Sequence, residues 1–252
     1  MKRIARLYAP LCLVVLLAVT SASEAAAGDG AGPFGVTVVA AATARSARVG
    51  ALFGADRVGR LAGGHFCTAS VVHSPHHNLV VTAAHCLDAA GDGDLVFVPG
   101  YRDGKAPYGV WRVKRRFLPD GWAEGQDEDS DVAFAVLAEK GDEGVEDVVG
   151  AERFASRMAT GATAVTVTGY PDSRETPITC TNKPTVHSTT QQRIDCPDFT
   201  GGTSGSPWVN GDGEVVGVLG GHEEGGATAD ISYSVVLGRE AAELYGDAAA
   251  DP

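Results

Sequence analysis

After residue 19 the sequence has no apolar run long enough for a membrane-spanning helix. The run LCLVVLLAV at 11–19 has nine residues, too few to cross about 30 Å of hydrocarbon. It is preceded by Lys2, Arg3 and Arg6 and followed by small residues that end in the A-x-A pattern of Ala25–Ala27. This arrangement is typical of a secretory signal peptide, so we expect cleavage after Ala27, removal of 1–27, and a secreted, extracellular protein.

Zinc-binding motifs are also missing. No two cysteines form a C-x-x-C pair, and HEEGG at 222–226 lacks the second histidine of H-E-x-x-H, so we expect no metal site. Of the five cysteines, Cys12 lies in the apolar core of the signal peptide, with no small residue before it, which disfavours a lipid-modified cysteine. The exported chain keeps Cys67, Cys86, Cys180 and Cys196. An even number in an oxidising compartment indicates two disulfides, for which three connectivities exist.

Basic residues are outnumbered, with 20 Lys and Arg against 32 Asp and Glu and a formal charge of −12. Residues 1–27 hold three basic residues and one acid, so the exported chain has a formal charge near −14. Nucleic acids and anionic membrane surfaces bind basic patches, so we expect neither nucleic acid nor stable membrane association as a partner. A monomer is the default expectation.

Long helical periodicity is scarce as well, and glycine, at 33 of 252 residues, is nearly twice its usual share of about 7%. Short β-branched runs lie between glycine and polar turns at 79–84, 95–98, 131–137, 163–170 and 214–221. Many short strands at such spacing predict an all-β sandwich or barrel. Only GREAAELYGDAA at 238–249 has a helical pattern, so we expect a C-terminal helix docked on a β body.

Among seven histidines, His85 stands out because it ends the strand-like run VVTAAHC, directly before Cys86. Isolated histidines are mostly structural or on the surface, but a disulfide at Cys86 would fix this loop. Cys67, on the preceding strand-like segment HFCTASVV, is its natural partner, because a hairpin would bring the two strands together.

Asp131 is a second candidate, at the end of the acidic segment QDEDSD. The acids at 127–129 are interpreted as a solvated loop, whereas Asp131 abuts an apolar strand and can point inward. An EF-hand calcium loop does not fit, because Val132 stands where a glycine is needed and Ala138 where a bidentate glutamate is needed.

GGTSGSPW at 201–208 places Ser204 on a tight, glycine-flanked turn whose N–H groups could bind an oxyanion. A serine hydroxyl alone is a poor nucleophile near neutral pH. TAAHC, SDVAFAVL and GGTSGSPW, in this order, resemble the histidine, aspartate and serine motifs of trypsin/chymotrypsin-like serine peptidases. The resemblance covers about 49–246 and is closest to compact bacterial secreted members, including the glutamyl-endopeptidase-like branch with its G-x-S-G-S-P motif. Other folds with this triad carry it in a different order.

The resemblance implies an all-β fold of two six-stranded antiparallel β-barrels with the active site in the cleft between them, plus the C-terminal helix. The first barrel is expected at about 49–140 and the second at about 150–237, joined by the acidic segment 138–150. Cys180 and Cys196 are then expected to form the second disulfide, which braces the segment before the nucleophile. The implied activity is a secreted serine endopeptidase that acts on protein or peptide substrates without a cofactor.

In the roles that the resemblance implies, Ser204 attacks the scissile carbonyl, His85 accepts and returns its proton, and Asp131 holds the imidazole tautomer. The backbone N–H groups of Gly202 and Ser204 form the oxyanion hole, where a glycine avoids crowding the substrate. Two rival functions stay open: a catalytically silent secreted binding protein on the same scaffold, and an esterase.

The sequence departs from the family pattern at Thr203, where the wider family has an aspartate that pairs with a new N-terminus after zymogen cleavage. The usual activation switch is therefore not expected. SARVGALFG at 46–54 still resembles a mature start, which leaves 28–48 as a candidate short propeptide that ends near Arg48.

Substrate side-chain preference stays open. Asp198 lies six residues before Ser204, where the family resemblance implies that an acid would select Arg or Lys side chains of the substrate. Thr200, however, stands where the family usually has a cysteine, four residues before the serine. The glutamyl branch uses a histidine on the next strand, and that position is Leu219 here, with His222 just beyond it. The sequence slightly favours basic side chains in the substrate.

Overall fold

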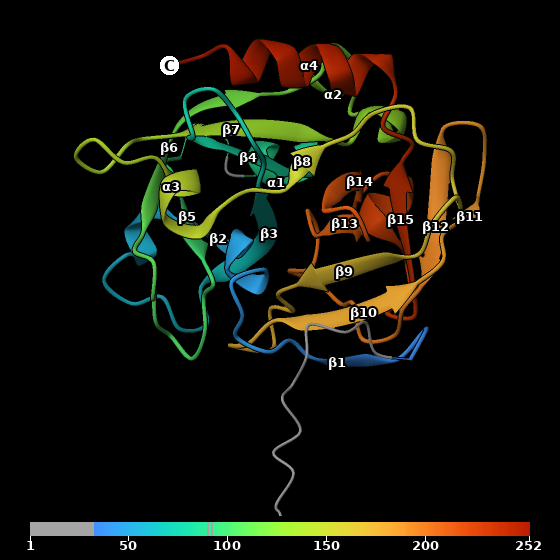
Figure 1. Cartoon of the computed structure of the whole chain (residues 1–252), viewed down its shortest axis with the longest axis horizontal. Coiled ribbons are helices and arrows are strands. Elements are labelled where there is room, and N and C mark those ends of the chain that lie inside the picture. Colours follow the sequence, from blue (N-terminus) through green and yellow to red (C-terminus); the bar gives the residue numbers. More distant parts are fainter. Residues whose placement is uncertain (1–32, 90, 92) are drawn as a thin grey trace, which may run out of the picture.

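The computed structural model describes residues 33–252 except 90 and 92, so the predicted signal peptide at 1–27 lies outside the described residues. Figure 1 shows two β-rich halves side by side, with the C-terminal helix lying across one end. Within the described part of the chain, no helix has both the length and the apolar composition to cross a membrane.

The first half is a closed six-stranded barrel in the order β2-β3-β4-β7-β6-β5, and all neighbouring strands pair antiparallel. Its strands are β2 (Val49–Gly54), β3 (His65–Val71), β4 (Leu79–Thr82), β5 (Leu95–Pro99), β6 (Trp111–Phe117) and β7 (Ala133–Leu137). Every residue of β4, β5 and β7 is buried. Strands that are buried on both faces need apolar residues at successive positions, which explains the runs LVVT, LVFVP and AFAVL.

The second closed barrel that the resemblance predicts is not confirmed by the described residues of the second half. Its described residues form an open six-stranded sheet, β1-β10-β9-β13-β14-β8, and a three-stranded sheet, β11-β12-β15. The strands are β1 (Thr37–Val39), β8 (Arg153–Phe154), β9 (Val165–Gly169), β10 (Ile178–Asn182), β11 (Thr185–Val186), β12 (Gln191–Asp195), β13 (Pro207–Asn210), β14 (Glu214–Val218) and β15 (Ile231–Val235).

The second half stays open between β14 and the three-stranded sheet. The first residues of β14 pair in parallel with β8. Farther along β14, the N–H of Val218 donates to Ser234 Oγ at 2.9 Å, and Gln192 Nε2 donates to the carbonyl of Val216 at 3.1 Å. Just after β14, the N–H of Gly220 donates to the carbonyl of Tyr233 on β15 at 3.0 Å. These isolated hydrogen bonds, rather than a continuous backbone ladder, join β14 to the three-stranded sheet in the described residues.

The predicted C-terminal helix is present as α4 (Arg239–Ala249), which packs on β7. The ring centroid of its Tyr245 lies 5.7 Å from that of Phe134 on β7 and 4.9 Å from that of Phe154 on β8. The helix therefore connects the barrel to the second half. The shorter helices are η1 (Ser46–Arg48), η2 (Ala55–Arg57), α1 (Ala84–Asp88), α2 (Asp120–Gly125), η3 (Glu128–Ser130), α3 (Val145–Val149) and η4 (His222–Gly225).

The described part of the candidate propeptide, from residue 33 on, packs against the second half. β1 pairs antiparallel with β10, with Val39 opposite Ile178, and the N–H of Ala40 donates to the carbonyl of Pro177 at 2.9 Å. Figure 1 shows β1, in blue, beside β10. The segment then runs to η1 and directly into β2 of the barrel. It therefore contributes to both halves of the fold.

Candidate active site

His85 lies on α1, a single short helix that follows β4. The Cys67–Cys86 disulfide joins α1 to β3 and so fixes the backbone next to the imidazole. Ala84 and Cys86 on either side are fully buried, whereas the His85 side chain keeps 13% of its surface exposed. The side chain is therefore largely buried and keeps limited access to solvent.

Asp131 follows η3 directly, and its side chain is completely buried. Its Oδ2 accepts a hydrogen bond from His85 Nδ1 at 2.7 Å, and its Oδ1 accepts one from the backbone N–H of His85 at 2.9 Å. An ionised carboxylate only accepts hydrogen bonds, so Nδ1 carries the hydrogen and Nε2 has the free lone pair. A histidine in this tautomer can take a proton from a hydroxyl at Nε2.

A third donor to this carboxylate was not predicted from the sequence. The backbone N–H of Gly221 donates to Asp131 Oδ2 at 2.7 Å. A Cβ on Gly220 would lie 2.6 Å from the same oxygen, closer than Cβ atoms come in real structures. The two glycines thus allow the backbone after β14 to approach the carboxylate. Consecutive glycines at the end of a strand were the signal that the sequence offered.

Ser204 lies on the turn 201–206. Gly202 in this turn has a φ of +87°, and a Cβ there would lie 2.6 Å from the N of Asp172 and the carbonyl oxygen of Tyr170. Only glycine fits this backbone and this close approach. The N–H groups of Gly202 and Ser204 have no hydrogen-bond acceptor among the described residues. Two free N–H groups on one turn are the donors that an oxyanion needs.

Strand β3 connects the serine turn to the histidine. The N–H of Thr68 donates to the carbonyl of Ser204 at 2.7 Å, and the preceding Cys67 forms the disulfide next to His85. The three predicted residues are therefore linked through one strand and one disulfide. Hydrogen bonds join His85 directly to Asp131, whereas no hydrogen bond joins Ser204 Oγ to His85 Nε2 in the described chain. In enzymes without substrate this catalytic contact is often long.

The two specificity candidates have different surroundings. Asp198 is exposed and has a left-handed φ of 70°. The ring centroid of His222 lies 4.8 Å from those of His187 and Tyr233, and its Nδ1 lies 3.4 Å from Glu128 Oε2. These rings come from three separate segments, so no local pattern in the sequence could reveal the cluster. The contacts assign neither candidate a role in specificity.

A family model described as a trypsin-like peptidase domain matches residues 67–218. The chain belongs to this family. The matched range of the trypsin-like peptidase includes His85, Asp131 and Ser204. A search among curated protein sequences found no match.

Solved structures resemble this trypsin-like peptidase over most of its length. Protease Anisep from Arthrobacter nicotinovorans has 28% identity and a TM-score of 0.71, covering 83% of this chain and 99% of that one. Serine protease AL20 from an extremophilic microorganism has 29% identity and a TM-score of 0.71, covering 83% and 100%. Together with the family match, these similarities make the chain a trypsin-like serine endopeptidase.

Two more distant structures share only the fold with the trypsin-like peptidase. A Glu endopeptidase has 19% identity and a TM-score of 0.66, covering 88% of this chain and 99% of that one. Human heparin binding protein has 15% identity and a TM-score of 0.59, covering 84% and 92%. The resemblance to the glutamyl branch therefore stays a prediction.

Ligand atoms of Cys67, His85 and Cys86 in this peptidase lie within 4.8 Å of one another. The two sulfur atoms are bonded to each other, whereas a metal ion requires free thiolates. This cluster is therefore a covalent brace next to the histidine.

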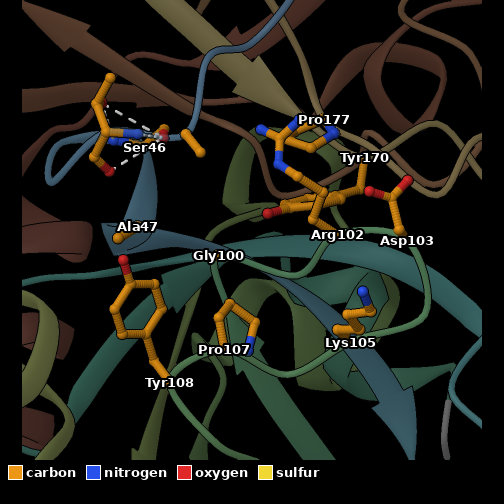
Figure 2. A pocket seen from close by; sticks show the side chains of 12 residues that line it. Ser46, Ala47, Gly100, Arg102, Asp103, Lys105, Pro107, Tyr108, Tyr170 and Pro177 are labelled. Carbon is orange, nitrogen blue, oxygen red and sulfur yellow. Dashed lines mark hydrogen bonds between the residues drawn. The ribbon is translucent and has the colours of Figure 1, made fainter.

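A cavity of about 300 Å³ lies where residues 42–47, the β5–β6 connection and residues that follow β9 meet. Figure 2 shows Arg102, Asp103 and Lys105 on one side of it, with Tyr108 below Ala47 on the other. None of the three triad candidates lines it. Burial raises the pKa of Tyr170 in its wall, so that hydroxyl stays protonated. Residues 42–47 form one wall of this cavity.

Proposed function

We propose that this peptidase is a secreted endopeptidase that hydrolyses peptide bonds with a triad of Ser204, His85 and Asp131. The main support is the buried Asp131 carboxylate, which accepts hydrogen bonds from both the ring and the backbone of His85. The signal-peptide pattern at 1–27 and the two disulfides support export to an oxidising compartment.

In the first half of the reaction, Ser204 Oγ attacks the carbonyl carbon of the scissile bond while its proton passes to Nε2 of His85. The C–N bond then breaks as the imidazolium gives that proton to the leaving amine, which forms an acyl-enzyme. Asp131 stabilises the imidazolium and keeps the other proton on Nδ1. Water then attacks the acyl carbonyl by the same route, releases the acid and restores Ser204. No step needs a cofactor.

The oxyanion of each tetrahedral intermediate is assigned to the free N–H groups of Gly202 and Ser204. Loss of one such donor typically lowers the rate about 100–1000-fold. Neither N–H group has a hydrogen-bond acceptor among the described residues, which supports this assignment. The substrate is a protein or peptide, and the choice between basic and acidic side chains is left to experiment.

Two rival functions use the same scaffold. Because human heparin binding protein has this fold, the fold alone does not decide between catalysis and binding. The contact of Asp131 with His85 favours catalysis, since a carboxylate buried to orient an imidazole serves proton transfer rather than surface binding. An esterase would use the same acyl-enzyme chemistry on ester substrates.

Labelling with an organophosphonate serine probe tests the nucleophile. We expect the wild-type protein to be labelled at Ser204, located by peptide mass spectrometry, and His85→Ala to lose labelling. His76→Ala is the matched control, because His76 is exposed on the β3–β4 hairpin, and it should be labelled at the wild-type rate. Folded wild-type protein that takes up no label would favour the binding-protein function.

Digestion of a peptide library, read by mass spectrometry, separates the remaining alternatives. Cleavage of peptide bonds supports the endopeptidase, whereas turnover of activated esters alone supports the esterase. The residues that precede the cut bonds then decide the preference. Cuts clustered after Glu would count against the slight preference for basic side chains.

A further inference from the structure

Thr68 on β3 makes four hydrogen bonds at the junction of the barrel and the serine turn. It is completely buried, and its N–H donates to the carbonyl of Ser204 at 2.7 Å. Its Oγ1 donates to the carbonyl of Gly202 at 3.0 Å and accepts from the N–H of Tyr170 at 2.9 Å. Its carbonyl accepts from Thr82 Oγ1 at 2.7 Å. Since the Tyr170 N–H can only donate, the hydroxyl hydrogen of Thr68 is directed to Gly202.

The orientation of the two free N–H groups depends on three successive peptide planes. In a trans peptide the C=O and N–H point in opposite directions, so a fixed carbonyl also fixes the N–H. The carbonyl of Gly201, which shares a plane with the Gly202 N–H, accepts from the N–H of Asp172 at 2.7 Å. The carbonyl of Thr203, which shares a plane with the Ser204 N–H, accepts from Ser206 Oγ at 2.6 Å.

The middle plane, between these two, is held from both ends. Its carbonyl, on Gly202, accepts the hydrogen bond from Thr68 Oγ1. Its N–H, on Thr203, donates to the carbonyl of Thr200 at 3.1 Å. Rotation of this plane would turn both flanking planes and so separate the two free N–H groups. Thr68 is the only side chain from the barrel that bonds to this plane in the described structure.

We propose that the Thr68 hydroxyl is a positioning residue that keeps the N–H groups of Gly202 and Ser204 aimed at one point. The inference rests on the proposed function, because it assigns those groups to the oxyanion. It also explains how the turn is ordered although Thr203 has no carboxylate to pair with a new N-terminus. The Thr203 hydroxyl bonds within the turn, to the carbonyl of Thr200 at 2.6 Å, and Thr68 supplies the external contact.

The test compares Thr68→Val, which keeps the shape and loses the hydroxyl, with Thr68→Ser, which keeps the hydroxyl. We expect Thr68→Val to lower kcat by about 10–100-fold while KM changes less than about threefold, because the contact acts on the transition state. Affinity for a peptide boronate, which mimics the tetrahedral intermediate, should fall in parallel. Thr68→Ser should restore kcat to within about threefold of wild type.

Thr181→Val is the matched control. Thr181 is buried on β10, and its hydroxyl is 2.9 Å from Thr166 Oγ1, with no hydrogen bond to the serine turn among the described residues. The Thr181→Val variant should lose thermal stability, as Thr68→Val does, but should keep the wild-type kcat. Circular dichroism checks folding first, and Thr68→Ala, which adds no bulk, carries the same expectation if the valine variant does not fold.

The results separate this inference from the proposed function. Wild-type protein that fails to react at Ser204 would reject the proposed triad itself. Reactive wild-type protein together with a folded Thr68→Val of unchanged kcat would reject the positioning role alone. A loss of kcat that Thr68→Ser does not restore would also count against the hydroxyl.

Discussion

Arg48 Nη1 lies 3.2 Å from Oε2 of Glu152, whose side chain is only 2% exposed. Glu152 lies in the connection between the halves, and its backbone bonds to Val71 and His73 of the barrel. Removal of one partner from a buried ion pair typically costs about 3–5 kcal/mol, because the other charge is left unpaired. Arg48, at the end of the candidate propeptide, is therefore also the counter-ion of the buried Glu152 in the folded protein.

We accordingly expect the active protein to retain residues 37–48. Intact-mass measurement of the phosphonate-labelled protein should include them. Arg48→Gln, which removes the basic residue at this position, should still be labelled but should lose about 1–3 kcal/mol in urea unfolding, since the half-exposed Arg45 remains near the same carboxylate. Glu152→Gln in the same chain should recover part of that loss. Fully active protein that starts at Val49 would contradict this expectation.

The pair of His77 and Asp147 predicts a pH dependence of stability. Two hydrogen bonds lower the pKa of Asp147 below 3.8: the larger effect comes from the Gly144 N–H and the smaller from the His77 ring. The hydrogen bond to Asp147 in turn raises the pKa of His77 above 6.5. The Asp147 contribution is lost as pH falls through its lowered pKa, and the His77 contribution is lost as pH rises through its raised pKa. The pair should therefore stabilise the fold most at about pH 5–6.

Melting temperatures from pH 4 to 9 check this window. We expect the difference between wild type and His77→Gln to be greatest in the acidic range and to shrink above neutral pH. The charge of Glu146 also raises the pKa of His77, so this contribution is part of the measured difference. His76→Gln, at an exposed position of the same hairpin, should show no such pH dependence. A difference that is constant with pH would contradict the assignment.

Local sequence patterns predicted the parts of the fold that depend on apolar runs. The runs at 79–84, 95–98 and 131–137 correspond to β4, β5 and β7, and α4 lies where the helical pattern placed it. β6 (WRVKRRF) and β12 (QQRID) were missed because charged and amide side chains interrupt the apolar signal. β1 was missed because it is only three residues long, although it lies within the β-branched run VTVV at 36–39.

The candidate site also has residues that could be predicted from the sequence and contacts that could not. Ser204, His85 and Asp131 could be selected because each lies in a short, ordered motif. The Gly221 N–H on Asp131 and the Thr68 hydroxyl on Gly202 could not, because both contacts join segments far apart in the sequence. The contacts of Gln192 and Ser234 with β14 could not be predicted either, because they also join segments far apart in the sequence.

Gly220→Ala should disturb the candidate triad without replacing any of its members. The new Cβ would lie 2.6 Å from Asp131 Oδ2, so the carboxylate or the backbone at residue 220 must shift, and we expect the contact of Asp131 with His85 to be disturbed. Misplacement by about 1 Å can cost about 100-fold in rate, and we expect a loss of that order in kcat/KM. Gly211→Ala is the control, because a Cβ there meets nothing within 4 Å, and its activity should equal that of wild type. Equal activities of both variants would show that the carboxylate tolerates the shift.

The two disulfides should have similar effects on stability and different effects on catalysis. Their cysteines are separated by 19 and 16 residues, so loss of either should cost about 3 kcal/mol in unfolding free energy by the chain-entropy account. Only Cys67–Cys86 joins α1, which carries His85, to β3, which contacts Ser204.

The double alanine variant of Cys67–Cys86 should therefore lose about tenfold or more in kcat/KM, measured well below its melting temperature. The Cys180–Cys196 double alanine variant, of matched stability loss, should keep its activity within about threefold of wild type. Equal losses of activity in the two variants would mean that the first disulfide stabilises the fold without positioning the histidine.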